Sequence, residues 1–186
     1  MITSETNPEN PAPETTLPPT PNALLREALQ AAMGDSLQGF EESYGMLSVI
    51  VKSTDSLKLL QHLYDNHGFQ FLTDIAAVHY PTRPGEELCV VYHLHNLPAN
   101  HRLRLKTFVP IEKPDVFTAT QLFPGANWME RETYDYFGVN FVGHPNLRRI
   151  LNVDEMDYFP MRKEFPMEDP TRRDKDDEMF GRGGSF

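Results

Sequence analysis

The sequence predicts an α+β fold: a mostly antiparallel four-stranded sheet with helices on one face, followed by an irregular extended C-terminal arm. Two segments with helical spacing of apolar residues alternate with four strand-like runs, and hairpin-length linkers separate the last three runs. No period is sustained after Gly138. A sheet covered by helices is the natural packing for this order of elements, and a chain of 186 residues can form one such domain with tails.

The N-terminal region changes character at residue 23. Residues 1–22 are rich in Pro, Thr, Asn and Glu and contain few large apolar side chains. Such a segment cannot bury enough surface to offset the entropy of ordering, so we expect a disordered, acidic, Pro-rich tail. Beyond it, Leu24, Leu25 and Leu29 fall at helical spacing before Gly34, which predicts a first amphipathic helix.

A strand and a second helix follow. Residues 44–53 read as a strand because apolar and β-branched residues dominate them. Thr54 or Asp55 is placed to cap the next helix at its N-terminus. The pair His67-Gly68 is typical of a helix end.

Three further strands are predicted at residues 69–81, 87–97 and 101–111. Their short linkers favour antiparallel pairing. In the third strand, apolar or neutral residues alternate strictly with basic ones, so one face should be buried and the other wet and basic. The alternating sets are Leu103, Leu105 and Thr107 against Arg102, Arg104 and Lys106.

The next segment should be helical. Residues 115–122 are helix-prone, up to a break at Phe123. Asn127 and Glu130 have the spacing of a capping box, which predicts another helix starting near Asn127. Gly138 is well placed to end that helix in the left-handed conformation.

These elements set the expected organisation of the chain. The α+β domain should span residues 23–140. Residues 141–167 contain prolines and mixed charges but too many aromatic and aliphatic side chains for a free tail, so we expect an irregular arm that binds a partner. Residues 168–186 form a charged, Gly-containing tail that could become ordered on a partner.

Composition excludes several classes of function. A net charge of −10 disfavours nucleic acid as a partner. Cys89, the one cysteine, cannot form an intramolecular disulfide or hold a metal or iron–sulfur cluster alone, and its apolar neighbours predict a buried hydrophobe. No apolar run approaches the roughly 20 residues that span a bilayer. We therefore expect a soluble protein that meets the membrane only through its partners.

The sequence contains no recognisable catalytic or metal-binding motif. The seven histidines lack the spacing of metal ligands, and no nucleotide-binding or nucleophile motif is present. Asp154, Glu155 and Asp157 are adjacent carboxylates without a partner acid at a defined spacing. We predict no catalytic, cofactor-binding or metal-binding residue in this chain.

The helix that begins near Asn127 is more informative. Arg131 and Asp135 are i,i+4 neighbours, and Glu132 lies beside them, so the helix should have a charged side with paired signs. Two interpretations stay open: a solvated, salt-bridged surface, or a polar interface that fixes the register of a partner. The arm favours the interface, because basic residues mixed with Phe, Tyr and Met are typical of protein interfaces. These basic residues are Arg148, Arg149, Arg162 and Lys163.

The same region resembles a known family, the C subunit of the proton-pumping NADH-quinone oxidoreductase, respiratory complex I. The resemblance extends over about residues 23–166 and is strongest after Trp128. It departs from the family pattern in the shortened stretch at residues 158–161 and in Glu164, where Asp is usual. The signature and expected interface residues are Glu130, Arg131, Glu132, Asp135, Tyr136, Phe137, His144, Arg148, Arg149, Ile150, Leu151, Arg162, Lys163, Phe165 and Pro166.

The resemblance implies a subunit of the peripheral arm that supports the quinone-site module and has no active site of its own. FMN, iron–sulfur clusters and quinone would belong to partner subunits, above all the quinone-pocket (D-type) subunit and the iron–sulfur subunits beside it. The expected location is the cytoplasmic face of the bacterial inner membrane, as a peripheral protein. The alternative is a homologous subunit of a membrane-bound hydrogenase or a ferredoxin–plastoquinone reductase.

Overall fold

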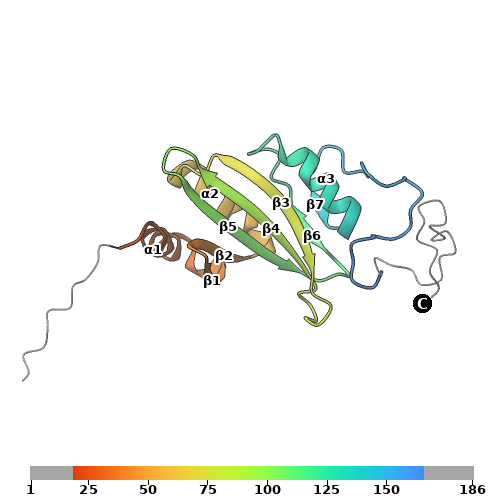
Figure 1. Cartoon of the computed structure of the whole chain (residues 1–186), viewed down its shortest axis with the longest axis horizontal. Helices are drawn as coiled ribbons and strands as arrows, with labels where there is room; N and C mark the ends of the chain where they lie inside the picture. Colours follow the sequence, from red (N-terminus) through yellow and green to blue (C-terminus); the bar gives the residue numbers. More distant parts are fainter. Residues whose placement is uncertain (1–18, 166–186) are drawn as a thin grey trace, which may run out of the picture.

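The computed structural model describes residues 19–165, which form a five-stranded sheet, a two-stranded sheet and three α-helices (Figure 1). The first half contains α1 Pro21–Met33, β1 Leu37–Ser43, β2 Met46–Lys52 and α2 Ser56–His67, with short 3-10 turns at Gly34–Ser36 and Ser53–Asp55. The second half contains β3 Phe71–His79, β4 Leu88–Asn96, β5 His101–Val109, β6 Asp115–Phe117, α3 Ala126–Phe137 and β7 Asn140–Val142.

The large sheet has the strand order β1-β2-β5-β4-β3. All neighbouring strands are antiparallel except β2 and β5, which run parallel. One cross-strand row, Val49, Leu105, Tyr92 and Ile75, is buried and marks the face that the helices cover. The core lies between this face and the three helices, and Figure 1 shows α2 behind the strands and α3 beside β3.

The predicted fold class is confirmed, with one strand added. β1 was not predicted because its sequence is polar and only partly buried. It forms a strand because β2 supplies antiparallel backbone partners from Leu37 to Ser43. The hairpin pairing of β3, β4 and β5 and the alternation of burial along β5 agree with the sequence.

The predicted helix at residues 115–122 is wrong. Residues Asp115–Phe117 form β6, which pairs in parallel with β7, and Thr118 continues the contact by donating its N–H to the carbonyl of Val142. These partners lie more than 20 residues away in sequence, so local propensity could not reveal them.

The helices and strands extend slightly beyond residues 23–140. α1 begins at Pro21, two residues before the predicted start, with Thr20 as its N-cap. β7 extends the domain to Val142, past the predicted limit at residue 140. Most of the predicted tail at residues 1–22, the end of the arm including Pro166, and the tail at 168–186 lie outside the described residues.

Asn22 fixes the start of α1 to the sheet. Its side-chain amide donates to Glu42 Oε1 at 2.8 Å and to the carbonyl of Gly45 at 3.0 Å. Its side-chain oxygen lies 2.7 Å from His101 Nε2. Burial lowers the pKa of His101, so the neutral ring donates through Nε2.

We expect Asn22→Ala to lower the free energy of unfolding by about 1–3 kcal/mol, because three partly buried hydrogen bonds are lost together. Urea denaturation followed by circular dichroism measures this change. Leu24→Ala is the matched control on the same helix, since the Leu24 side chain is 54% exposed and its loss should cost under about 0.5 kcal/mol. Equal effects of the two substitutions would contradict this role for Asn22.

Candidate functional site

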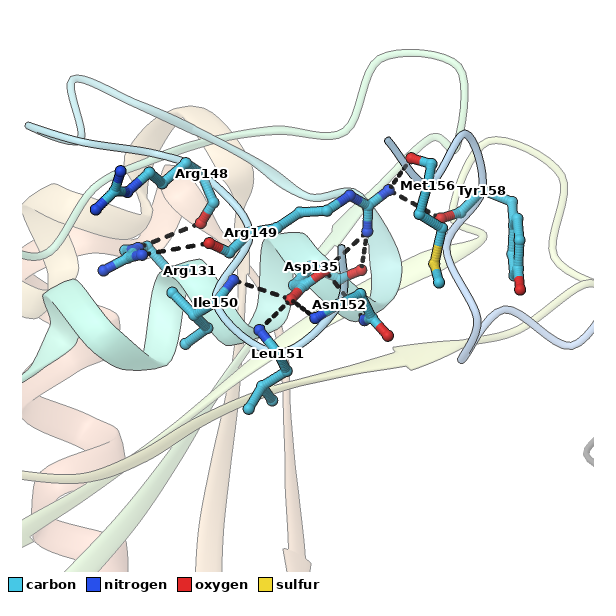
Figure 2. Close-up of polar contacts among 9 residues, drawn as sticks. All are labelled: Arg131, Asp135, Arg148, Arg149, Ile150, Leu151, Asn152, Met156 and Tyr158. Carbon is cyan, nitrogen blue, oxygen red and sulfur yellow. Dashed lines mark hydrogen bonds and ion pairs between the residues drawn. The ribbon is translucent and has the colours of Figure 1, made fainter. Parts of the chain in front are cut away.

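Helix α3 presents its charged residues to its own chain. Asp135 is fully buried, and its Oδ2 accepts three successive backbone N–H groups of the arm, from Ile150 at 3.0 Å, Leu151 at 2.8 Å and Asn152 at 2.9 Å (Figure 2). Consecutive N–H groups pointing at one oxygen form a backbone nest that favours a negative charge. The helix therefore holds residues 150–152 of the arm through a single carboxylate.

Arg149 completes this contact. Its Nη1 donates to Asp135 Oδ1 at 2.7 Å and to the Asp135 carbonyl at 2.9 Å. Its Nη2 donates to the carbonyls of Met156 at 2.8 Å and Tyr158 at 2.9 Å, as Figure 2 shows. Asn152 adds a side-chain bond to Oδ1 at 3.1 Å. The arm thus folds back on itself around one buried ion pair, which is the geometry in which a buried pair is fully hydrogen-bonded.

Arg131 supports the same turn from the side. Its guanidinium donates to the carbonyls of Arg148 at 3.2 Å and Arg149 at 3.3 Å. The guanidinium also lies 5.0 Å from the ring centre of Trp128, one turn earlier on α3. We call Arg131, Asp135, Arg149 and Asn152 the arm clamp.

The end of α3 forms a second contact with the arm. Gly138 ends the helix in the left-handed conformation, with φ at 77°, as the sequence predicts. A Cβ atom there would lie 2.5 Å from the Phe159 ring and 2.7 Å from Arg162 Nη2, so only glycine lets the arm approach this closely. Arg162 Nε donates to the carbonyl of Phe137 at 2.8 Å, and the Met161 N–H donates to that of Tyr136.

Glu130 holds the opposite side of α3. It is fully buried, and its carboxylate accepts from the Thr118 hydroxyl at 2.6 Å and from the Ala119 N–H at 2.6 Å. The predicted capping box is therefore wrong, because Glu130 turns toward the segment after β6 and Gly125 occupies the N-cap position without a side-chain bond. His144 lies nearby, with Nε2 3.1 Å from the carbonyl of Asn127 and 4.0 Å from Glu130.

The pKa values of the two buried carboxylates of α3 are shifted in opposite directions. Burial raises the pKa of Glu130 to about 7, because the hydrogen bonds from Thr118 and Ala119 offset only part of the desolvation. Burial also opposes ionisation of Asp135, but the N–H groups of Asn152 and Leu151 and the Arg149 guanidinium outweigh it and hold that pKa well below 3.8. Asp135 is therefore ionised at neutral pH, whereas the raised pKa of Glu130 lies near neutral pH.

The predicted ion pair between Arg131 and Asp135 is wrong. Asp135 pairs with Arg149, fourteen residues later in sequence, and Arg131 binds backbone carbonyls instead. The charged side of the helix is therefore not a solvated surface, because the arm covers Arg131 and Asp135. Glu132 alone of the signature acids remains exposed.

The other signature residues fall into two groups. Tyr136, Phe137, His144, Ile150 and Arg162 are partly buried against the domain or the arm, whereas Arg148, Leu151 and Lys163 are exposed. Phe165 packs against Tyr158, with ring centres 4.9 Å apart. The Lys163 N–H donates to Nδ1 of the buried His79 at 2.9 Å.

Sequence reasoning missed four contributors to this site: Thr118, Asn152, Phe159 and His79. Asn152 and Phe159 lie within the predicted arm, but an irregular segment has no period that could identify their partners. Thr118 and His79 contact the site across long sequence separations. No local signal in the sequence could have revealed them.

The clamp leaves an apolar surface beside it. Trp128 is 64% exposed, Leu151 58% and Val153 63%. Leu151 lies in the turn whose backbone Asp135 holds, and Val153 follows directly after that turn. Within residues 19–165, no three His, Cys, Asp or Glu side chains gather as a metal-ion site, and no helix is long and apolar enough to cross a membrane.

Fold and site together define a class of protein: an α+β domain that uses buried ions to hold an arm on its surface. The sequence matches the family described as "Respiratory-chain NADH dehydrogenase, 30 Kd subunit" over residues 49–171. A C subunit of NADH-quinone oxidoreductase from Rhizobium meliloti is 43% identical over 78% of this chain and 70% of its own length. The C subunit of the same enzyme from Parvibaculum lavamentivorans is 40% identical over 78% and 72%.

Two solved structures are also similar to this chain. Nqo5, in the form of a trypsin-resistant fragment, superposes with a TM-score of 0.58 at 36% identity, covering 66% of this chain and 98% of the fragment. A chain of the membrane-bound sulfane sulfur reductase, an archaeal respiratory membrane complex, gives a TM-score of 0.66 at 26% identity, covering 77% and 84%. The chain belongs to the family of the 30 Kd subunit of NADH-quinone oxidoreductase, complex I, as its signature residues predict.

We expect Asp135→Asn to release the turn at residues 150–152 while leaving the sheet intact. An amide cannot match the carboxylate that accepts three N–H groups and a guanidinium, and each charged hydrogen bond is worth about 1.5–3 kcal/mol. Backbone amides 150–152 should therefore exchange with deuterium at least about tenfold faster, as measured by mass spectrometry. Glu132→Gln is the matched control on the exposed side of α3 and should change nothing.

The pH dependence of this contact follows from the lowered pKa of Asp135. A group whose pKa is depressed in the folded state stabilises above its ordinary pKa and loses that contribution as the pH falls. Protection of the turn should therefore be constant from neutral pH down to about pH 4 and decline below it. Loss of protection between pH 7 and pH 5 would contradict the assignment.

Glu130 should affect the pH dependence of stability in the direction opposite to Asp135, and Glu130→Gln should remove that effect. The pKa of Glu130 is raised in the folded state from 4.5 to about 7, so the folded protein binds more protons than the unfolded chain between these values. The Glu130 contribution should thus fall as the pH rises through this window, by up to about 1.4 kcal/mol per pH unit. Urea denaturation from pH 5 to pH 8 should show a flatter profile for the variant than for the natural protein, and parallel profiles would contradict the raised pKa.

Proposed function

We propose that this chain is a non-catalytic, cofactor-free subunit of the peripheral arm of NADH-quinone oxidoreductase, which supports the module where quinone is reduced. FMN, the iron–sulfur clusters and quinone are held by partner subunits. The observation that carries the proposal is the arm clamp: its three ions, Arg131, Asp135 and Arg149, are saturated by contacts within the chain. They are therefore committed to holding a surface, and they are not free to bind a substrate.

The surface held by the clamp supports a role in assembly. Trp128 on α3, and Leu151 and Val153 on the arm, each expose a large apolar side chain. Arg148 is also exposed on the arm, where its guanidinium can meet a carboxylate of a partner. Aromatic and arginine side chains dominate the energetics of protein interfaces. A partner that covers this surface gains apolar burial without any ordering cost for the arm, because the clamp has already fixed it.

The partners that we propose are the quinone-pocket (D-type) subunit and the iron–sulfur subunits beside it, on the cytoplasmic face of the bacterial inner membrane. The chain reaches the membrane only through these subunits. The names of the relatives do not favour the alternative of a membrane-bound hydrogenase or ferredoxin–plastoquinone reductase, because both relatives described above are subunits of NADH-quinone oxidoreductase.

We expect Leu151→Asn to impair assembly of the complex without unfolding the subunit. The Leu151 side chain is 58% exposed in the isolated chain, so its replacement costs little there, but it removes about 1.5–3 kcal/mol of apolar burial under a partner. The amount of partner subunits that co-purify with the tagged chain in mild detergent should fall about tenfold. The melting temperature of the isolated chain should stay the same.

Leu24→Asn is the matched control for this experiment. Leu24 is similarly exposed, at 54%, but lies on α1, outside the matched residues 49–171. It should leave both assembly and stability unchanged. Normal recovery of all partner subunits with Leu151→Asn would contradict an interface at the clamp.

A further inference from the structure

The face of the large sheet that the helices leave open carries a second surface, separate from the arm clamp. Side chains on this face follow the register of the strands. Its first row is Phe71 on β3, His95 on β4 and Arg102 on β5, which are direct cross-strand partners. Met46 and Thr73 complete a hollow of about 290 Å³ with these three and with His93. Figure 1 shows the strands of this face in front of α2.

The basic residues of β5 point to this open face. Lys106 is paired, since its Nζ lies 2.6 Å from Glu41 Oε2. Arg104 donates through Nε to His93 Nε2 at 3.1 Å, so the ring of His93 accepts and holds the guanidinium in place. Burial and then the charge of Arg104 lower the pKa of His93, which keeps that ring neutral. Within residues 19–165, neither Arg102 nor Arg104 forms an ion pair with a carboxylate.

Exposed apolar side chains lie at the same end of this face as Arg102. Phe71 is 47% exposed and Leu97, in the turn between β4 and β5, is 57% exposed. Phe71 and His95 also line a neighbouring hollow with Leu97 and Pro98. The patch therefore combines an aromatic ring, an aliphatic side chain and two arginines, the composition that anchors protein partners.

We propose that this open face is a second docking surface, and that its occupant is an acidic segment of a neighbouring polypeptide. Two carboxylates of the segment meet Arg102 and Arg104, and an apolar side chain enters the hollow between Phe71 and Met46. The two arginines are two residues apart on one strand, so their Cα atoms lie about 7 Å apart. Alternate residues of an extended segment match this spacing.

Charge complementarity decides the class of partner. The chain has a net charge of −10, so two unmatched arginines beside an aromatic ring form a local exception that an acidic segment would recognise. A nucleic acid carries phosphates along its whole length and would also meet the acidic remainder of the chain, whereas a short acidic segment can contact the two arginines alone. An anionic membrane surface is attracted by clusters of about 4–8 basic residues, more than this face offers.

Site-specific photo-crosslinking in the assembled complex tests this proposal. Phe71 is replaced by the benzophenone amino acid p-benzoylphenylalanine, which keeps an aromatic ring at an exposed position. The complex is purified in mild detergent and irradiated, and the adducts are identified by mass spectrometry. We expect an adduct with another subunit, at a peptide with at least two Asp or Glu residues close to the site of attachment. The same probe at the exposed Tyr44, on the turn between β1 and β2, should not label that peptide.

A charge series then tests the role of the arginines. The double substitution Arg102→Glu and Arg104→Glu, in the chain carrying the probe, should reduce the adduct at least tenfold. The double substitution to Lys should retain it within about threefold, because the positive charge stays. Absence of a protein adduct, an adduct only with lipid or nucleic acid, an adduct peptide without carboxylates, or an unchanged yield in the Glu variant would each overturn the proposal. The proposed assembly role of the arm is judged separately, by the Leu151→Asn variant.

Discussion

The buried carboxylate of Asp135 is the constraint on which the arm depends. A charge removed from water must be matched by hydrogen bonds and an opposite charge, and helix α3 alone cannot supply them. Residues 149–152 supply them all, from three backbone N–H groups, one guanidinium and one side-chain amide. The path of an otherwise irregular segment therefore follows from the need to satisfy one side chain.

Helix α3 is joined to the segment after β6 through Glu130 and to the arm through Asp135. Glu130 and Asp135 are both inaccessible to water, yet the pKa of Glu130 is raised and that of Asp135 is lowered. The difference lies in the number and charge of the donors: two neutral donors face Glu130, whereas a nest of N–H groups and an arginine face Asp135. The helix is thereby attached to β6 on one side and to the arm on the other.

The distribution of charge explains how an acidic chain can present basic and apolar surfaces to partners. Arg131 and Arg149 are used inside the chain, and Arg148, Arg102 and Arg104 are left at two surfaces. Large apolar side chains are exposed in the same two regions: Trp128 on α3 and Leu151 on the arm, and Phe71 on β3. The first is fixed by an ion pair and the second by the register of the sheet, so neither requires a partner in order to form.

The sequence by itself determined the elements whose signals are local. Helical spacing located α1 and α2, strand-like runs with short linkers located the β3–β5 hairpins, Gly138 marked the end of α3, and the signature identified the family. Only the tertiary structure decided β1, β6 and the partners of the buried acids. Arg131 is the nearest cation to Asp135 on the helix, but Arg149 reaches it together with backbone donors of the same turn. Helical spacing predicts neighbours within one helix only. The partners of a buried charge can come from any segment that folding brings close to it, as the arm does for Asp135.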